Sequence, residues 1–177
     1  VTPPTDSNVD FALGVSVTTT EANGGATTTT SGSINVDVAG DADTPSITLT
    51  DAAGAEDTAI SLDISSQLND TDGSESLSVT VSNIPDGAVL ASDGVTIDVT
   101  DGSATLTPDQ LSGLTITPPL NSADDFSLAI SATSTEDDGD SASITGILDV
   151  TVGEDADAPT LVLNDASGTE DTGIDLD

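Results

Sequence analysis

The stretch FSLAISATSTE, residues 126–136, decides the fold class of this chain. Every second residue of its first half is apolar, and these residues are Phe126, Leu128, Ile130 and Ala132. Successive side chains of a β-strand point to opposite faces of a sheet, so a period of two with one apolar face is typical of a half-buried antiparallel strand. We therefore expect a strand here, with Phe126 anchoring the core.

The same alternation recurs at residues 60–65, 77–81, 95–99 and 148–152. Turn signals containing Asp-Gly pairs separate these segments. The sequence TPDQL at 107–111 predicts one short helical turn, because Thr caps such turns and Pro suits their first position. About seven short strands in about 114 residues predict an all-β fold, an antiparallel β-sandwich.

The chain also repeats itself. Residues 41–63 recur at 155–177 with an offset of 114, and residues 1–25 recur at 116–140 with an offset of 115. The one-residue difference places an insertion or deletion between the two blocks. A period of this length matches a whole sandwich domain rather than a solenoid unit. The predicted organisation is the C-terminal part of a preceding repeat at 1–43, a complete repeat at 44–157, and the N-terminal strands of the next repeat at 158–177.

The charge of the chain has one sign. It contains 33 Asp and Glu residues and no Lys, Arg or His, which gives a formal charge of −33. Like charges destabilise a compact state, so we expect compensating cations from outside the chain. The acidic residues cluster with other oxygen-bearing residues and glycine. Such clusters suit Ca²⁺, which takes six to eight oxygen ligands in flexible geometry, and Ca²⁺ is the predicted cofactor.

The composition argues against several functions. Nucleic acid binding relies on Lys and Arg, which are absent. Enzymatic chemistry is not expected, because the chain has no His, Cys or Lys to act as base or nucleophile. No apolar run approaches the roughly 18 residues of a membrane helix, so membrane insertion is not expected either.

Two short acidic segments precede a proline and are predicted to be linkers between repeats. In an extended chain, two Asp residues separated by one residue place both carboxylates on the same side. The predicted junction ligands are Asp41, Asp43, Asp155 and Asp157. A solvated acidic linker without metal is the alternative.

Three further clusters are candidate metal ligands. One is an acidic pair after a small loop, present in both copies of the repeat. The second is NDTDGSE at 69–75, which resembles the opening of an EF-hand loop but lacks the acidic residue at position twelve. The third follows the 126–136 stretch. For the second and third clusters an ordinary acidic turn is the alternative. The predicted ligands are Glu56, Asp57, Asp70, Asp72, Glu75, Glu136, Asp138, Asp140, Glu170 and Asp171.

The earlier copy of the third cluster departs from the pattern. Residues 21–25 read EANGG where residues 136–140 read EDDGD, so Glu21 is kept and three Asp residues are missing. If the cluster binds metal, the corresponding site of the preceding repeat should be weaker or lost.

The motifs taken together resemble those of a known family. They are D-A-D-x-P, G-x-E-D-T-x-I-x-L, D-x-D-G-S-E-S-L, G-L-x-I-T-P-P, D-F-x-L-x-I-x-A-T-S-T-E and I-L-D-V-T-V. This set resembles the tandem immunoglobulin-like extender repeats of giant RTX-type adhesins, which are secreted by the type I route. The D-x-D-x-P segments are also similar in arrangement to cadherin calcium linkers. The resemblance implies an immunoglobulin-like sandwich, Ca²⁺ at domain junctions, an extracellular cell-surface location, and a spacer role in cell adhesion and biofilm attachment.

Three functions follow as hypotheses. The first is a calcium-stabilised structural extender whose partners are neighbouring repeats of the same chain. The second is a module that binds a carbohydrate or protein through loop-bound Ca²⁺, although only Phe11 and Phe126 offer rings for a sugar to stack on. The third is a subunit of a self-assembling extracellular filament.

Overall fold

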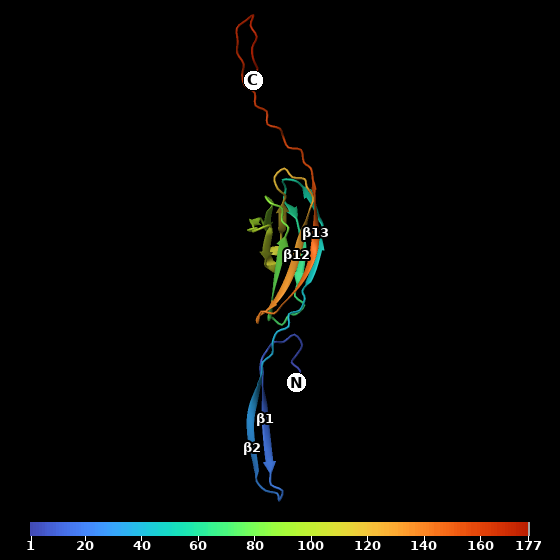
Figure 1. Ribbon diagram of the computed structural model, residues 1–177, viewed down its shortest axis with the longest axis vertical. Coiled ribbons are helices and arrows are strands. Elements are labelled where there is room, and N and C mark those ends of the chain that lie inside the picture. Colours follow the sequence, from blue (N-terminus) through green and yellow to red (C-terminus); the bar gives the residue numbers. More distant parts are fainter. Residues whose placement is uncertain (177) are drawn as a thin grey trace.

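The computed structural model describes residues 1–176 and shows an elongated molecule with three parts in line (Figure 1). A long hairpin, β1 (Phe11–Thr20) and β2 (Thr27–Val36), lies at one end, drawn in blue. A compact body of strands lies in the middle, and an extended C-terminal segment leaves its opposite end. Among residues 1–176, no helix is long and apolar enough to span a membrane.

The middle body consists of short strands and one turn of 3₁₀-helix. These elements are β3 (Ser46–Thr50), β4 (Ala52–Ala55), β5 (Ile60–Ser61), β6 (Asp63–Gln67), β7 (Glu75–Ser82), β8 (Val89–Ser92), β9 (Val95–Thr96), β10 (Ser103–Leu106), η1 (Pro108–Leu111), β11 (Leu114–Thr117), β12 (Phe126–Glu136) and β13 (Ser141–Gly153). The helical turn η1 forms where the sequence predicts it, with Thr107 at its N-cap and Pro108 as its first residue.

The strands form two layers around one core. One sheet has the strand order β10-β7-β12-β13-β4, and a second has the order β5-β11-β8-β9 beside the pair β3-β6. All pairs are antiparallel except β13 with β4. The buried apolar side chains form a single cluster drawn from both layers. The predicted all-β sandwich is confirmed at this level.

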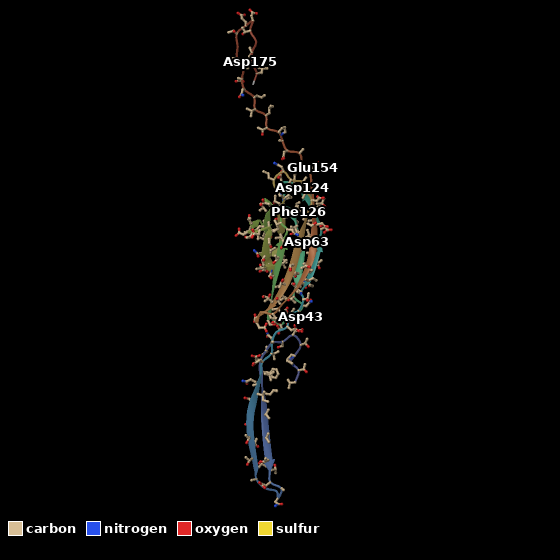
Figure 2. All side chains as sticks on the ribbon, in the orientation of Figure 1. Asp43, Asp63, Asp124, Phe126, Glu154 and Asp175 are labelled. Carbon is tan, nitrogen blue, oxygen red and sulfur yellow. The ribbon has the colours of Figure 1, made fainter. Side chains whose placement is uncertain are left out.

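The alternation of the 126–136 stretch is confirmed in β12, with one correction. Leu128, Ile130 and Ala132 are buried, with at most 1% of each side chain exposed. Phe126 lies on the same inward face and packs against the core as predicted, but it is only partly buried and so is not the fully buried anchor that the alternation suggests. It is the first residue of β12, near the upper end of the body, and the pairing of β12 with β7 begins only at Ala129 (Figure 2).

The position of Phe126 sets the expected effect of its removal. Truncation of a fully buried Phe typically costs about 3–5 kcal/mol. We expect Phe126→Ala to cost less than this range, since part of the ring is already in contact with solvent. Urea unfolding of the variant and of Leu128→Ala measures the difference. If Phe126→Ala lowered the free energy of unfolding more than Leu128→Ala does, the partial burial of Phe126 would be contradicted.

The hairpin β1–β2 pairs in the same register as the hairpin β12–β13. Phe11 pairs with Val36, and Phe126 pairs with Val150, which are equivalent positions at the two sequence offsets. Both strand pairs end on equivalent residues, so the one-residue difference falls in the connecting turns, 21–26 against 136–140. The two hairpins also share a side-chain hydrogen bond at their open ends. Asp10 Oδ1 accepts Val38 N at 2.8 Å, as Asp125 Oδ1 accepts Val152 N at 2.8 Å.

The segment predicted as the N-terminal strands of a next repeat, 158–177, forms no strand over residues 158–176, and residue 177 lies outside the described residues. Its equivalents in the middle body form β3, β4 and β5, which pair with β6, β13 and β11. A strand needs a partner for its backbone N–H and C=O groups. The segment therefore remains extended, with Leu161 and Leu163 at least 77% exposed.

Candidate functional site

The lower end of the sandwich holds the linker that arrives from the hairpin. The β12–β13 turn and the start of β7 lie beside residues 40–43. Gly40 N donates to Asp138 Oδ2 at 2.9 Å, and Ala42 N donates to Asp140 Oδ2 at 3.0 Å. Alternate residues of the linker thus donate to two carboxylates of one turn.

Two more contacts hold the end of this linker. Asp43 N donates to Glu75 Oε1 at 2.7 Å, and Asp43 O accepts the hydroxyl of buried Ser134 at 2.5 Å. Asp43 marks the junction between body and hairpin in Figure 2. The linker is therefore docked through its backbone, and its own Asp side chains stay exposed.

Several carboxylates at this end are withdrawn from water. Asp70 is 4% exposed and Glu136 is 5% exposed. Within residues 1–176, Glu75 Oε2 is a buried oxygen without a hydrogen-bond partner. Burying a carboxylate is costly unless it is paired and hydrogen-bonded, and the sequence contains no Lys, Arg or His to pair with it.

The loop before β7 is organised by its own acidic residues. Asp72 N donates to Asp70 Oδ1 at 2.8 Å. The Ser74 hydroxyl and backbone N–H donate to Asp72 Oδ1 at 2.6 and 2.8 Å, and these bonds hold the pKa of Asp72 below its ordinary value. N–H groups of Asp140 and Gly40 likewise lower the pKa of Asp138.

Glu136 differs from these two groups. Its burial raises its pKa, and the charges of Glu75, Asp138 and Asp70 add to the increase, while a hydrogen bond with Ser74 opposes it. A raised pKa shows that negative charge at this position is disfavoured. Burial and the neighbouring carboxylates therefore both act against the charged form of Glu136.

The segment before β1 contributes two residues to this end that the sequence analysis missed. Asn8 Nδ2 donates to Glu136 Oε2 at 3.2 Å, across 128 positions of the chain. Asp6 has a raised pKa, first through burial and then through the charges of Asp70, Asp43 and Asp72. A hollow of about 410 Å³ lies between the segment before β1, the linker and Glu136, and it is lined by Asp6, Asn8, Gly40, Asp41, Asp43, Glu136 and neighbouring residues.

The repeat carried a signal for Asp6. Asp6 and Asn121 occupy equivalent positions after the two TPP motifs, and both bear a side-chain oxygen. Both also have left-handed backbones, with φ of 57° and 55°. Asp and Asn are enriched in this conformation. The equivalent placement of an oxygen-bearing residue at both repeat ends was visible in the sequence.

The upper end of the sandwich gathers a second group. Glu56, 8% exposed, accepts Asp155 N at 2.8 Å, and Asp57 Oδ1 accepts Asn121 N at 2.8 Å. When the Asn121 side-chain amide is oriented with its nitrogen toward the two carboxylates, Nδ2 donates to Asp57 Oδ2 at 3.3 Å and to Asp157 Oδ2 at 2.8 Å. Figure 2 places Asp124 and Glu154 at this same end.

Most of the predicted ligands thus lie in two groups, one at each end of the sandwich. Glu170 and Asp171 lie in a turn of the extended C-terminal segment, apart from both. In the described range 1–176, no group of three or more acidic side chains is arranged so that it could hold a metal ion as it stands. The lower group is Asp41, Asp43, Asp70, Asp72, Glu75, Glu136, Asp138 and Asp140, and the upper group is Glu56, Asp57, Asp155 and Asp157.

The chain was compared with known proteins. No protein-family model matches it, and no curated protein matches it at a significant level. The interpretation of the two ends therefore rests on the residues themselves.

Proposed function

We propose that this chain is part of a calcium-stabilised structural extender, with an immunoglobulin-like sandwich as its repeat, in a long extracellular bacterial adhesin of the RTX type. The observation that carries the proposal is the buried Glu75 Oε2, which has no hydrogen-bond partner among residues 1–176, beside buried Asp70 and Glu136 in a chain without basic side chains. This oxygen lies where the linker docks, since the other oxygen of Glu75 accepts Asp43 N.

The chemistry of the donor set fits Ca²⁺. The lower end offers only oxygen ligands, from carboxylates, an amide and hydroxyls. Ca²⁺ accepts mixed oxygen ligands in irregular geometry, whereas Mg²⁺ demands a near-octahedral set. Glu75, Glu136 and Asp70 would supply buried ligands, and Asp6, Asp41 and Asp43 would supply exposed ones. The bound ion would favour the charged form of Glu136, which burial and the neighbouring carboxylates disfavour.

The mechanical role follows from where these residues originate. Asp6 and Asn8 precede β1, Asp41 and Asp43 belong to the linker, and Glu75 belongs to the sandwich. A cation shared among them would join these three parts of the chain at one point. Neighbouring repeats of the same chain are therefore the proposed partners, and cell-surface attachment or biofilm formation is the proposed setting.

Addition of Ca²⁺ should fix the angle between the hairpin and the sandwich. The chain lacks Cys, so Thr28→Cys and Thr96→Cys provide two unique spin-label sites on exposed strand residues. We expect the interspin distance distribution to narrow with Ca²⁺ and to broaden in excess chelator. The matched control is KCl at equal ionic strength, since salt screens exposed charges without occupying a site. The proposal would be rejected if the interspin distance distribution had the same width in Ca²⁺ and in chelator.

Replacement of the linker carboxylates tests their assignment to the junction. The variant Asp41→Ala/Asp43→Ala removes two proposed ligands but leaves the backbone donors of the linker in place. We expect a broader interspin distribution in Ca²⁺, with a sandwich melting temperature close to that of the parent. Asp37→Ala, also exposed and in the same linker, is the control. Early melting with an unchanged distance distribution would show that Asp41 and Asp43 act within the sandwich instead.

A further inference from the structure

The junction at residues 37–43 has a docking contact that requires glycine. A Cβ atom added to Gly40 would lie 2.8 Å from both Cγ and Cδ of Glu136. Glu136 is 5% exposed and accepts a hydrogen bond from Asn8, so it has little freedom to move away. The linker can lie against the sandwich at this point because position 40 has no side chain.

The same junction needs the two carboxylates of the β12–β13 turn. The Asp138 and Asp140 carboxylates accept hydrogen bonds from Gly40 N and Ala42 N, in the middle of the linker. The turn itself is closed by a backbone bond from Glu136 N to Asp140 O at 2.9 Å. Turn closure and linker docking thus depend on different atoms of the same residues.

The equivalent turn of the preceding hairpin keeps the closure and loses the docking groups. Glu21 N donates to Ala26 O at 3.3 Å, as in the later turn. By this closure Ala26 takes the place of Asp140, and Asn23 takes the place of Asp138. This turn therefore offers a docking linker one neutral amide, whereas the later turn offers two carboxylates.

The next linker lacks the glycine. Residues 152–157 read VGEDAD where residues 38–43 read VAGDAD, so Glu154 occupies the position of Gly40. A side chain at this position cannot take the close contact that Gly40 makes with Glu136. It also adds a negative charge next to the upper acidic group.

We infer that this chain encodes joints of two kinds. The joint at residues 37–43 is locked by Gly40 and the turn carboxylates, and the joints that use the turn 21–26 and the linker 152–157 are hinges. The inference rests on the proposed function in one respect, since it treats the chain as part of an array. An array with such joints bends at defined places instead of uniformly, and its stiffness is set by one turn and one linker position per joint.

The test replaces residues of the locked joint by those found at the equivalent positions of the other turn and the other linker. Asp138→Asn/Asp140→Ala gives the turn the residues found at 23 and 26, and Gly40→Glu gives the linker the residue found at 154. The spin labels at positions 28 and 96 are measured in excess Ca²⁺. We expect the distance distribution of both variants to broaden about twofold, because local docking contacts set local mobility.

The control is Asp137→Ala/Asp86→Ala, which removes two exposed carboxylates that accept no hydrogen bond from the linker within the described residues. It should keep the width of the parent. The melting temperature of each variant verifies that the sandwich is folded, and Gly40→Glu gives an independent result if the turn variant unfolds. A distribution as narrow as that of the parent in either folded variant would overturn the inference, as would a parent as broad as both variants.

This outcome is separable from that of the proposed function. Calcium stiffening is judged by the parent with and without Ca²⁺, whereas the lock is judged by parent against variant in one buffer. The calcium proposal would be rejected, and the lock supported, if the interspin distance distribution of the parent did not change with Ca²⁺ but was narrower than those of both variants.

Discussion

Replacement of Ile130 by alanine should lower the free energy of unfolding by about 2–5 kcal/mol, the range for removal of a large aliphatic side chain from a core. Ile130 lies in the middle of β12 with 1% of its side chain exposed and belongs to the single apolar cluster. A domain of this size has only about 5–15 kcal/mol in total. The variant should therefore be close to unfolding at room temperature, as measured by urea denaturation.

Ile147 provides a matched control for this variant. It lies on the neighbouring strand β13, but its side chain is 68% exposed. Ile147→Ala should change the free energy of unfolding by no more than about 0.5 kcal/mol, as is usual for surface positions. A similar loss for both variants would show that the two faces of this sheet are not distinguished by burial as the structure has them.

Removal of Ca²⁺ should have an effect of comparable size. A ligand that binds only the folded state, at 100 times its Kd, stabilises that state by about 2.7 kcal/mol per site. For a domain of about 100 residues this corresponds to a fall in Tm of about 10 °C or more upon chelation. Calorimetry in Ca²⁺ and in excess chelator, at matched ionic strength, measures the fall.

Mg²⁺ separates a specific site from general charge neutralisation. It carries the same charge as Ca²⁺ but binds poorly to irregular oxygen clusters. We expect Mg²⁺ to restore only a minor part of the lost Tm. Full recovery with Mg²⁺ would indicate neutralisation of the −33 charge without a calcium site, and an unchanged Tm in chelator would remove the basis of the calcium argument.

The sequence by itself determined the longer strands and the equivalence of the two hairpins, whereas the alternation at 95–99 yields only the two-residue β9 and that at 60–65 is divided between β5 and β6. Alternation is a local property, because each side chain of a strand points away from its neighbours whatever the rest of the fold does. Leu128 and Ile130 are accordingly buried as predicted. The repeat offsets also anticipated equivalent partners, and Phe11 and Phe126 do pair with equivalent residues of the facing strands.

Only the tertiary structure decided which polar residues meet. Asn8 reaches Glu136 across 128 positions, and Gly40 and Ala42 reach the β12–β13 turn across 98. Such contacts depend on which loops arrive at the same end of the sandwich, and no local pattern encodes this. For the same reason the sequence could not show that Phe126 lies where the core ends, or that Glu75 Oε2 is left without a partner among the described residues. Burial of a side chain is set by the strands that surround it, which the chain supplies from distant segments.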